Sequence, residues 1–190
     1  MLKYLSVLFL LFISSAAIAQ TVAWTTNPAN GHSYALVNST AWADAESQAV
    51  ALGGHLATIN DVAENQWLAN WTLGTSAPDR VWIGLYQAAG SPEPAGGWAW
   101  VSGQPMDFTN WDNGEPNNAL NKEPVGEFYV RTHVSFEHSG SWNDTWAEHP
   151  GIPAGIVEKE TVVTPEPASL ILLLAGILPC GLLHRRRLKA

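Results

Sequence analysis

The sequence predicts an α+β fold, because its helical patterns come early in the chain and its strand patterns come late. Two stretches with apolar residues at helical spacing lie in the first half, and several short strand-like runs follow them. Elements in that order favour an α+β arrangement over a parallel sheet built from alternating strands and helices. A third observation is that residues 102–126 show no periodicity. A loop of about 25 residues in a compact domain is usually functional.

The two helical stretches have recognisable starts and ends. The first, at residues 42–52, has one apolar face and stops at Gly53-Gly54. The second begins at Asp61, which together with Glu64 has the form of a capping box, and it continues through Trp71. We therefore expect two helices before the strand-rich part of the chain.

The other regular segments are typical of short strands, because they are rich in apolar and β-branched residues and are flanked by turn residues. The first, residues 24–37, contains a turn at Asn30-Gly31. The others are residues 55–59, 81–85, 98–101, 128–134, 141–144 and 155–157.

The long loop contains the stretch Trp111-Asp112-Asn113-Gly114-Glu115-Pro116-Asn117-Asn118. Its density of carboxylate and amide oxygens suggests a hard cation, since Ca²⁺ takes about six to eight oxygen ligands of these kinds. The same residue types also form ordinary polar turns. The stretch by itself is therefore compatible with either a cation site or a turn.

The charge distribution excludes a nucleic-acid partner. The chain has 9 basic and 17 acidic residues. Only 4 of the basic residues but 16 of the acidic ones lie in residues 20–164. A segment this acidic repels phosphate backbones and attracts cations. The single cysteine, Cys180, lies outside this segment, which therefore cannot contain a disulfide.

Both ends of the chain have the features of targeting segments. Residues 1–19 have one early lysine, an apolar run and the small residues Ala17-Ile18-Ala19. These features predict a secretory signal peptide that is cleaved after Ala19.

The other end, residues 165–190, begins with Pro165-Glu166-Pro167, continues with an apolar stretch at 168–183 and ends in an arginine cluster. The apolar stretch is a marginal transmembrane segment, with basic residues that would stay in the cytoplasm. The order of these three features resembles the PEP-CTERM sorting signal of Gram-negative bacteria. The resemblance implies transient membrane anchoring, recognition by an exosortase-type protease and release to the cell surface or matrix. The alternative is a permanent inner-membrane anchor that holds a periplasmic domain.

Several short motifs between the two ends occur in a fixed order. They are Trp42-x-x-Ala45, Gly53-Gly54-His55-Leu56-Ala57-Thr58-Ile59, Trp82-Ile83-Gly84-Leu85, Glu115-Pro116-Asn117 and Trp142-Asn143-Asp144. Together they resemble the C-type lectin-like domain, with a core at about residues 31–159 of the segment 20–164. The resemblance implies an α+β fold of two helices with small antiparallel sheets and a long ligand-binding loop.

In that family the long loop and the adjacent strand hold a Ca²⁺ ion that directly coordinates two sugar hydroxyls. Carried over by position, the resemblance assigns metal and sugar binding to five residues: Glu115, Asn117, Glu127, Asn143 and Asp144. Glu123 is the rival of Glu127, because an insert in the loop shifts the match. The resemblance also implies a cis peptide bond before Pro116, and the Glu-Pro-Asn form goes with mannose-type sugars.

This chain lacks the two disulfides that are usual in the family. By position, the cysteine pairs would fall at Ala49 with Val157 and at Tyr129 with Ala147. These residues are uncharged, and we expect each pair to pack in place of the cross-link.

We find no sequence pattern of an enzyme. The sequence has no Gly-x-Ser-x-Gly motif, no reactive cysteine in the domain and no phosphate-binding loop. The segment with His133, Glu137 and His138 lacks the spacing of a helical zinc pair. The sequence therefore predicts an exported, non-catalytic, Ca²⁺-dependent module that binds carbohydrate or exopolysaccharide. The alternative is a metal-independent protein-interaction or matrix structural module on the same fold.

Overall fold

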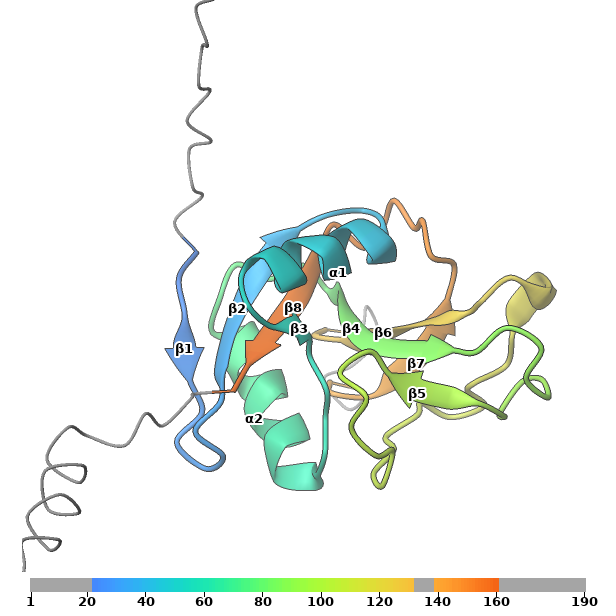
Figure 1. Cartoon of the computed structure of the whole chain (residues 1–190), viewed down its shortest axis with the longest axis horizontal. Helices are drawn as coiled ribbons and strands as arrows, with labels where there is room; N and C mark the ends of the chain where they lie inside the picture. Colours follow the sequence, from blue (N-terminus) through green and yellow to red (C-terminus); the bar gives the residue numbers. More distant parts are fainter. Residues whose placement is uncertain (1–21, 132–138, 161–190) are drawn as a thin grey trace, which may run out of the picture.

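The computed structural model describes residues 22–131 and 139–160. Within them the predicted order holds, with two helices early and most strands late (Figure 1). In chain order the elements are β1 Thr25–Thr26, β2 Ser33–Asn38, α1 Trp42–Ala51, β3 His55–Leu56, α2 Val62–Leu73, β4 Arg80–Gln87, β5 Trp98–Trp100, the 3₁₀ helix η1 Ala119–Asn121, β6 Val125–Tyr129, β7 Trp142–Thr145 and β8 Ala154–Lys159.

The strands form a mixed sheet rather than separate antiparallel ones. Its order is β1-β2-β8-β4-β6-β7, with β3 also on β8 and β5 also on β4. One parallel contact, between Trp82 of β4 and Gly155 of β8, joins two otherwise antiparallel halves. The α+β fold class is therefore confirmed, with this parallel junction as the feature that the sequence patterns did not predict.

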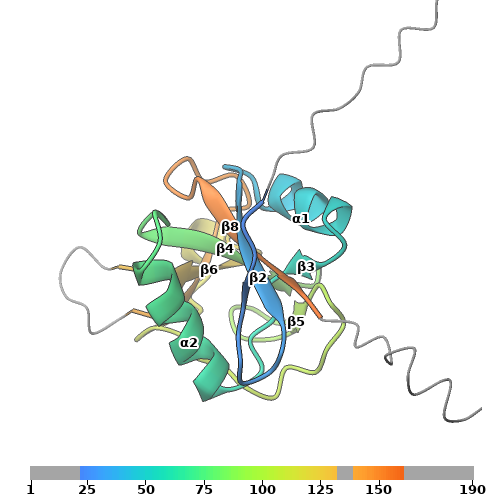
Figure 2. The same cartoon turned by 90° about the vertical axis from the view of Figure 1, so that its left-hand side faces the viewer.

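The two helices lie on either side of the β2–β8 pair (Figure 2). Helix α1 buries Ala45 and Ala49, and α2 buries Leu68 and Ala69. Helix α2 starts as predicted, because the Asp61 side chain accepts a hydrogen bond from the backbone N–H of Glu64 at 2.8 Å. The Glu64 carboxylate does not complete a capping box, since it accepts from the N–H of Asn60 at 2.8 Å instead.

A layer of aromatic side chains lies beneath the long loop. Trp142 is fully buried, and its ring meets those of Trp100, Phe108 and Trp111 edge-on at centroid distances of 5.4, 5.6 and 5.9 Å. Edge-to-face pairs of this kind stabilise by about 0.5–1.5 kcal/mol each beyond the area that they bury. Packed rings thus support a segment that has little regular structure of its own.

The positions of the missing disulfides are only partly as expected. Ala49 and Val157 belong to one apolar cluster, which confirms that packing takes the place of the first cross-link. Ala147 packs against the same cluster, which includes Val125. The predicted partner Tyr129 is wrong, because its backbone N–H donates to the carbonyl of Ser141, six positions before Ala147. Its ring lies 5.8 Å from the guanidinium of Arg80. Tyr129 is the last residue of β6, which therefore lies earlier in the chain than the strand predicted at 128–134.

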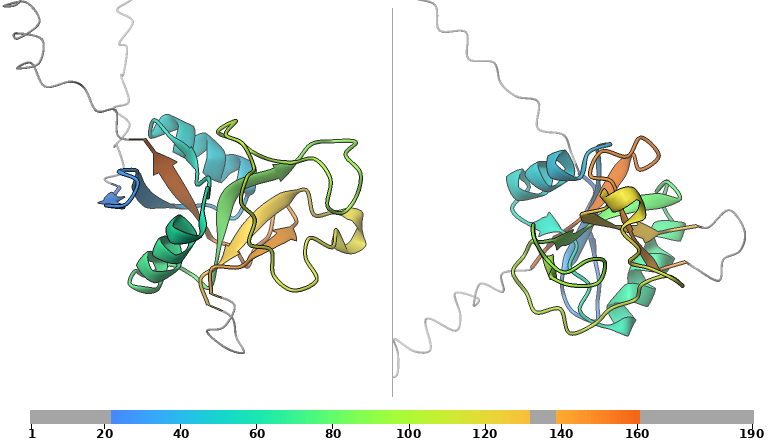
Figure 3. Two further views of the ribbon diagram at one scale, coloured as in Figure 1. Left: turned by 90° about the horizontal axis from the view of Figure 1, so that it is seen from below. Right: turned by 90° about the vertical axis from the view of Figure 1, so that its right-hand side faces the viewer.

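The loop and the ends of the described chain lie at opposite poles of the domain. Strand β1 and the last residues of β8 are at one end, and η1 is at the other (Figure 3). The predicted signal peptide, the sorting signal with its segment at 168–183, and His133, Glu137 and His138 all fall outside the described residues. Among the helices of the described part, none is long and apolar enough to cross a membrane.

Candidate functional site

The long loop is fastened to the start of β7. The backbone N–H of Asp112 donates to the carbonyl of Trp142, and the N–H of Trp142 donates to the carbonyl of Asn110, both at 2.8 Å. Trp111 also forms a parallel bridge with Trp142. These contacts bring the stretch that follows, Glu115-Pro116-Asn117, beside the next residues of β7.

The peptide bond between Glu115 and Pro116 is cis, as the sequence predicted. A second cis bond, between Glu93 and Pro94, lies in a different loop and was not predicted. Positive φ values at Asn118, Leu120 and Asn121 then turn the chain sharply through η1. Three non-glycine residues with left-handed backbone conformation within four positions are unusual. Side-chain hydrogen bonds support the turn that they form.

Asp144 is the residue that joins the loop to the sheet. It is fully buried in β7. Its Oδ1 accepts from the backbone N–H of Asn117 at 3.0 Å, and its Oδ2 accepts from that of Asn118 at 2.7 Å. A carboxylate that accepts two backbone donors holds its neighbours in a fixed geometry. Two of the predicted site residues are thus in direct contact, although 27 positions separate them.

Glu115 lies against Asp144 with one oxygen unsatisfied. Its Oε2 is buried and has no hydrogen-bond partner. Burial raises the pKa of Glu115 to about 7, and the hydrogen bond and negative charge of Asp144 add to this effect. Glu123 and Asp112 contribute further repulsion. Several negative groups therefore converge at the point where the sequence predicted a cation.

Glu123 closes the turn on the other side. Its carboxylate accepts from the N–H of Ala119 at 2.5 Å, and its own N–H donates to the side chain of Asn118 at 3.2 Å. Burial raises the pKa of Glu123, and the charges of Asp144 and Glu127 push it in the same direction. Glu123 is therefore part of the same electrostatic group as Glu115 and Asp144.

Glu127 has a different environment. It is fully buried in β6, and both of its oxygens accept hydrogen bonds from the guanidinium of Arg80, at 2.7 and 2.5 Å. Its Oε1 also accepts from Nδ2 of Asn143 at 2.8 Å. The predicted residues Glu127 and Asn143 are therefore neighbours, but the Glu127 carboxylate already forms an ion pair with Arg80.

The comparisons with known proteins agree with this geometry. A profile of the lectin C-type domain matches residues 38–149, which is more than half of the chain. The chain belongs to the C-type lectin domain family. This is a family of typically non-enzymatic binding proteins.

Individual relatives show how wide the family is. The chain is 32% identical to ladderlectin of Oncorhynchus mykiss over 126 residues, which cover 64% of this chain and 59% of that protein. The structure of the C-type lectin CEL-I from Cucumaria echinata matches with a TM-score of 0.58 and 26% identity, over 71% of this chain and 93% of that one. A calcium-independent type II antifreeze protein matches with the same TM-score at 21% identity, over 76% and 99% of the two chains, and so shares the fold alone.

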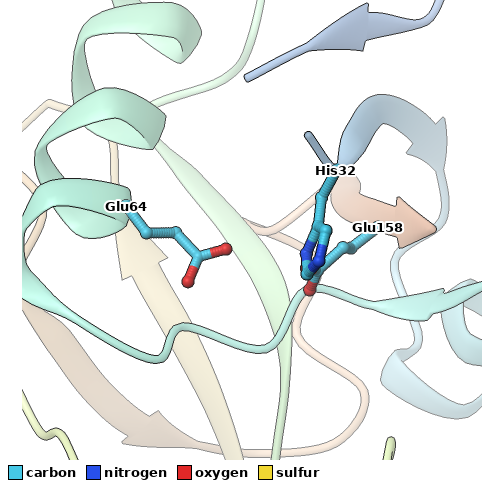
Figure 4. A group of neighbouring side chains, drawn as sticks. All are labelled: His32, Glu64 and Glu158. Carbon is cyan, nitrogen blue, oxygen red and sulfur yellow. The ribbon is translucent and has the colours of Figure 1, made fainter. Parts of the chain in front are cut away.

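The lectin domain contains a second carboxylate cluster that the sequence did not reveal. Glu64 of α2 reaches toward His32 and Glu158 (Figure 4), and one ligand atom from each of the three lies within 4.8 Å of the others. Nδ1 of His32 is 2.5 Å from Glu158, and the hydroxyl of Tyr34 donates to Glu64 and lies 3.2 Å from Glu158. Burial raises the pKa of Glu158, and the charge of Glu64 adds to it.

The oxygens of this second cluster are all satisfied from within the protein. Oε2 of Glu64 accepts from the N–H of Asn60, and Oε2 of Glu158 accepts from the N–H of Thr58, each at 2.8 Å. Oε1 of Glu158 bonds to His32, and Oε1 of Glu64 bonds to Tyr34. We therefore interpret the cluster as a structural hydrogen-bond network that joins α2 to β8.

Arg80, the counter-ion of Glu127, is the residue of this region that sequence reasoning missed. A usable signal existed, since Arg80 is one of only four basic residues in residues 20–164 and directly precedes a buried apolar strand. Long charged side chains at such positions are rarely buried without a partner.

Proposed function

We propose that this domain is a Ca²⁺-dependent carbohydrate-binding module. The observation that supports it best is the buried, unpartnered oxygen of Glu115 beside Asp144. Buried carboxylates that repel one another bind protons or cations. A Ca²⁺ ion accepts oxygens from both carboxylates and amides, and the loop and β7 supply both kinds.

The ion would be held by Glu115 and Asn117 from the loop and by Asn143 and Asp144 from β7. Nδ2 of Asn143 donates to Glu127, so its Oδ1 is the atom that can serve a cation. For the fifth ligand we propose Glu123, because its carboxylate shares the electrostatic environment of Glu115 and Asp144. Glu127, the ligand expected from the sequence, becomes the alternative, and it would have to exchange its bonds to Arg80 for the ion.

The proposed ligand is a carbohydrate with mannose-type vicinal hydroxyls, such as those of an exopolysaccharide. The support is the Glu115-Pro116-Asn117 form of the loop together with its cis bond. We place the protein outside the cell, at the surface or in the matrix of a Gram-negative bacterium. This location rests on the signal-peptide pattern at 1–19 and the PEP-CTERM-like pattern at 165–190, which would be processed by an exosortase-type protease.

A glycan array with and without EDTA tests the proposal directly. We expect binding to mannose-type glycans that disappears with the chelator. The double variant Asn143→Ala with Asp144→Ala should give no signal, and circular dichroism establishes that it is folded. Glycan binding that is unaffected by EDTA contradicts the Ca²⁺ mechanism.

A metal-independent interaction module is the second candidate. One observation favours it, because the two oxygens of Asp144 already hold the backbone of Asn117 and Asn118. The calcium-independent antifreeze protein shows that a protein of this fold can do without the ion. Calorimetric titration of residues 20–164 with Ca²⁺ separates the two. Heat and an increase in Tm at millimolar Ca²⁺ support the lectin, and the absence of both supports the second candidate.

A further inference from the structure

Three side chains form a row across three neighbouring strands at one edge of the proposed site. Arg80 is the first residue of β4, Glu127 lies in β6 and Asn143 in β7, and the sheet order places these strands side by side. Glu127 and Asn143 are direct cross-strand partners. Arg80 pairs with Tyr129, two residues from Glu127, and so reaches Glu127 diagonally.

The contacts within this row are strong and directional. Arg80 donates to both oxygens of Glu127 through Nε and Nη2, which is the two-point geometry that a guanidinium forms with a carboxylate. Its guanidinium also lies 5.8 Å from the centroid of the Tyr129 ring. A fully buried carboxylate needs such a counter-charge, because an unpaired charge in the protein interior is very unfavourable.

The row ends at a ligand position of the proposed site. Nδ2 of Asn143 donates to Oε1 of Glu127 at 2.8 Å. An amide group has its nitrogen on one side and its oxygen on the other, so a fixed nitrogen fixes the direction of the oxygen as well. The orientation of Asn143 thus depends on Glu127, and that of Glu127 depends on Arg80.

We infer that Arg80 is a positioning residue of the metal site, holding Glu127 so that Glu127 orients the Asn143 amide with its carbonyl oxygen available to the cation. The metal-binding part of this inference rests on the proposed Ca²⁺ function. It assigns Glu127 a supporting role rather than direct ligation. Groups that orient metal ligands in this way typically change metal affinity by about 10–100-fold when they are removed.

The rival assignment of Glu127 as a direct ligand predicts the opposite effect of removing Arg80. If Glu127 coordinates Ca²⁺, Arg80 competes with the ion, and the variant Arg80→Met should bind Ca²⁺ more tightly. If Arg80 positions the site, the same variant leaves Glu127 without its two donors and should bind about 10–100-fold more weakly.

The deciding experiment is a Ca²⁺ titration of the wild type, Arg80→Met, Arg80→Lys and the double variant Arg80→Met with Glu127→Gln. The neutral amide introduced by Glu127→Gln needs no counter-charge and still offers an oxygen to Asn143, so the double variant should recover most of the lost affinity. Arg80→Lys keeps the charge but not the two-point geometry, and it should lie in between. Equal or tighter binding by Arg80→Met, or complete loss in the double variant, overturns the inference.

A second measurement keeps the result independent of calcium. The side-chain NH₂ signals of Asn143 in ¹⁵N-correlated NMR spectra of the Ca²⁺-free protein report its bond to Glu127. We expect these signals to shift and exchange faster in Arg80→Met and to return toward the wild-type position in the double variant. Unchanged signals in Arg80→Met overturn the positioning role. If the wild type binds no Ca²⁺, the proposed function fails, and this measurement still tests the row.

If Arg80→Met does not fold, Arg80→Lys and the double variant decide alone. Circular dichroism and thermal unfolding of each variant establish which of them are folded. A folded double variant with near wild-type Ca²⁺ affinity supports the inference, and one that has lost Ca²⁺ binding assigns Glu127 as a ligand.

Discussion

The domain contains two groups of buried and half-buried carboxylates that differ in how their oxygens are satisfied. At the His32–Glu64–Glu158 cluster, all four carboxylate oxygens meet donors from the protein. At the loop, one buried oxygen of Glu115 has no partner, although it lies in a similar concentration of negative charge. Proximity of acidic groups is common to both. Of the two groups, the loop group alone has an unsatisfied carboxylate oxygen, and the proposed Ca²⁺ site rests on this difference.

Removing the unsatisfied carboxylate should have the largest effect. We expect Glu115→Gln to abolish measurable Ca²⁺ binding in calorimetry, because the site loses a charged ligand. Glu93→Gln is a matched control, since Glu93 also precedes a cis proline but lies exposed in another loop. An equal loss of Ca²⁺ binding in both variants, or Ca²⁺ binding that persists in Glu115→Gln, would contradict the proposal that the loop carboxylates bind the ion.

Breaking the satisfied cluster should reduce stability without changing Ca²⁺ affinity. Tyr34→Phe removes the hydroxyl between Glu64 and Glu158, and we expect it to lower the free energy of unfolding by about 1–3 kcal/mol. Urea denaturation measures this change, and Ca²⁺ titration of the folded variant measures the affinity. A tenfold loss of affinity in Tyr34→Phe would show that the two groups are coupled.

The pH dependence sharpens the comparison further. The pKa of Glu115 is raised from 4.5 to about 7, so the folded Ca²⁺-free protein binds a proton that the unfolded chain does not bind between these values. The Ca²⁺-free domain should therefore gain stability from Glu115 as pH falls from about 7 toward 4.5. Ca²⁺ competes with this proton, so its affinity should fall below pH 7 by up to about tenfold per unit.

Ca²⁺ titrations between pH 5.5 and 8 measure this dependence, with Tm of the Ca²⁺-free protein followed over the same range. An affinity that stays constant across the range contradicts the assignment of Glu115 as a ligand that must lose a proton.

The smallest expected effect is at the second cluster itself. Because the oxygens of this cluster are satisfied, we expect it to bind no metal ion. The variant Glu115→Gln, which disables the loop site, should therefore release no heat when it is titrated with Ca²⁺ or Zn²⁺, and its Tm should not change. An increase in Tm with Zn²⁺ that disappears in His32→Phe would instead identify the cluster as a metal site.

The features that the sequence predicted well are local ones. The second helix starts at Asp61, and the cis bond precedes Pro116, because a capping side chain and a Glu-Pro-Asn loop act over a few residues. The pairing of Tyr129 with Ala147 failed for a physical reason. The first four residues of β6 are all buried, so no polar–apolar alternation fixes its register in the sequence.

The long-range contacts could not be predicted from the sequence patterns. Arg80 and Glu127 are 47 positions apart, and His32 and Glu158 are 126 apart. The first contact depends on the antiparallel pairing of β4 with β6, and the second on that of β2 with β8. No short motif encodes either pairing. Glu127 was predicted as a ligand because its place before a strand matches the family's acid, whereas its counter-ion is not visible in the sequence.

The place of β8 in the sheet has a consequence for how the domain folds. The last strand of the described chain pairs with β2, β3 and β4, and its contacts with β2 join residues about 116 to 126 positions apart. Contacts between such distant residues form slowly, because the chain loses the entropy of closing a long loop before the contacts can stabilise it. Until β8 arrives, the early strands keep unpaired edges, which are prone to associate with other chains. A chain that emerges from its N-terminus therefore cannot complete its fold until nearly all of the domain is available.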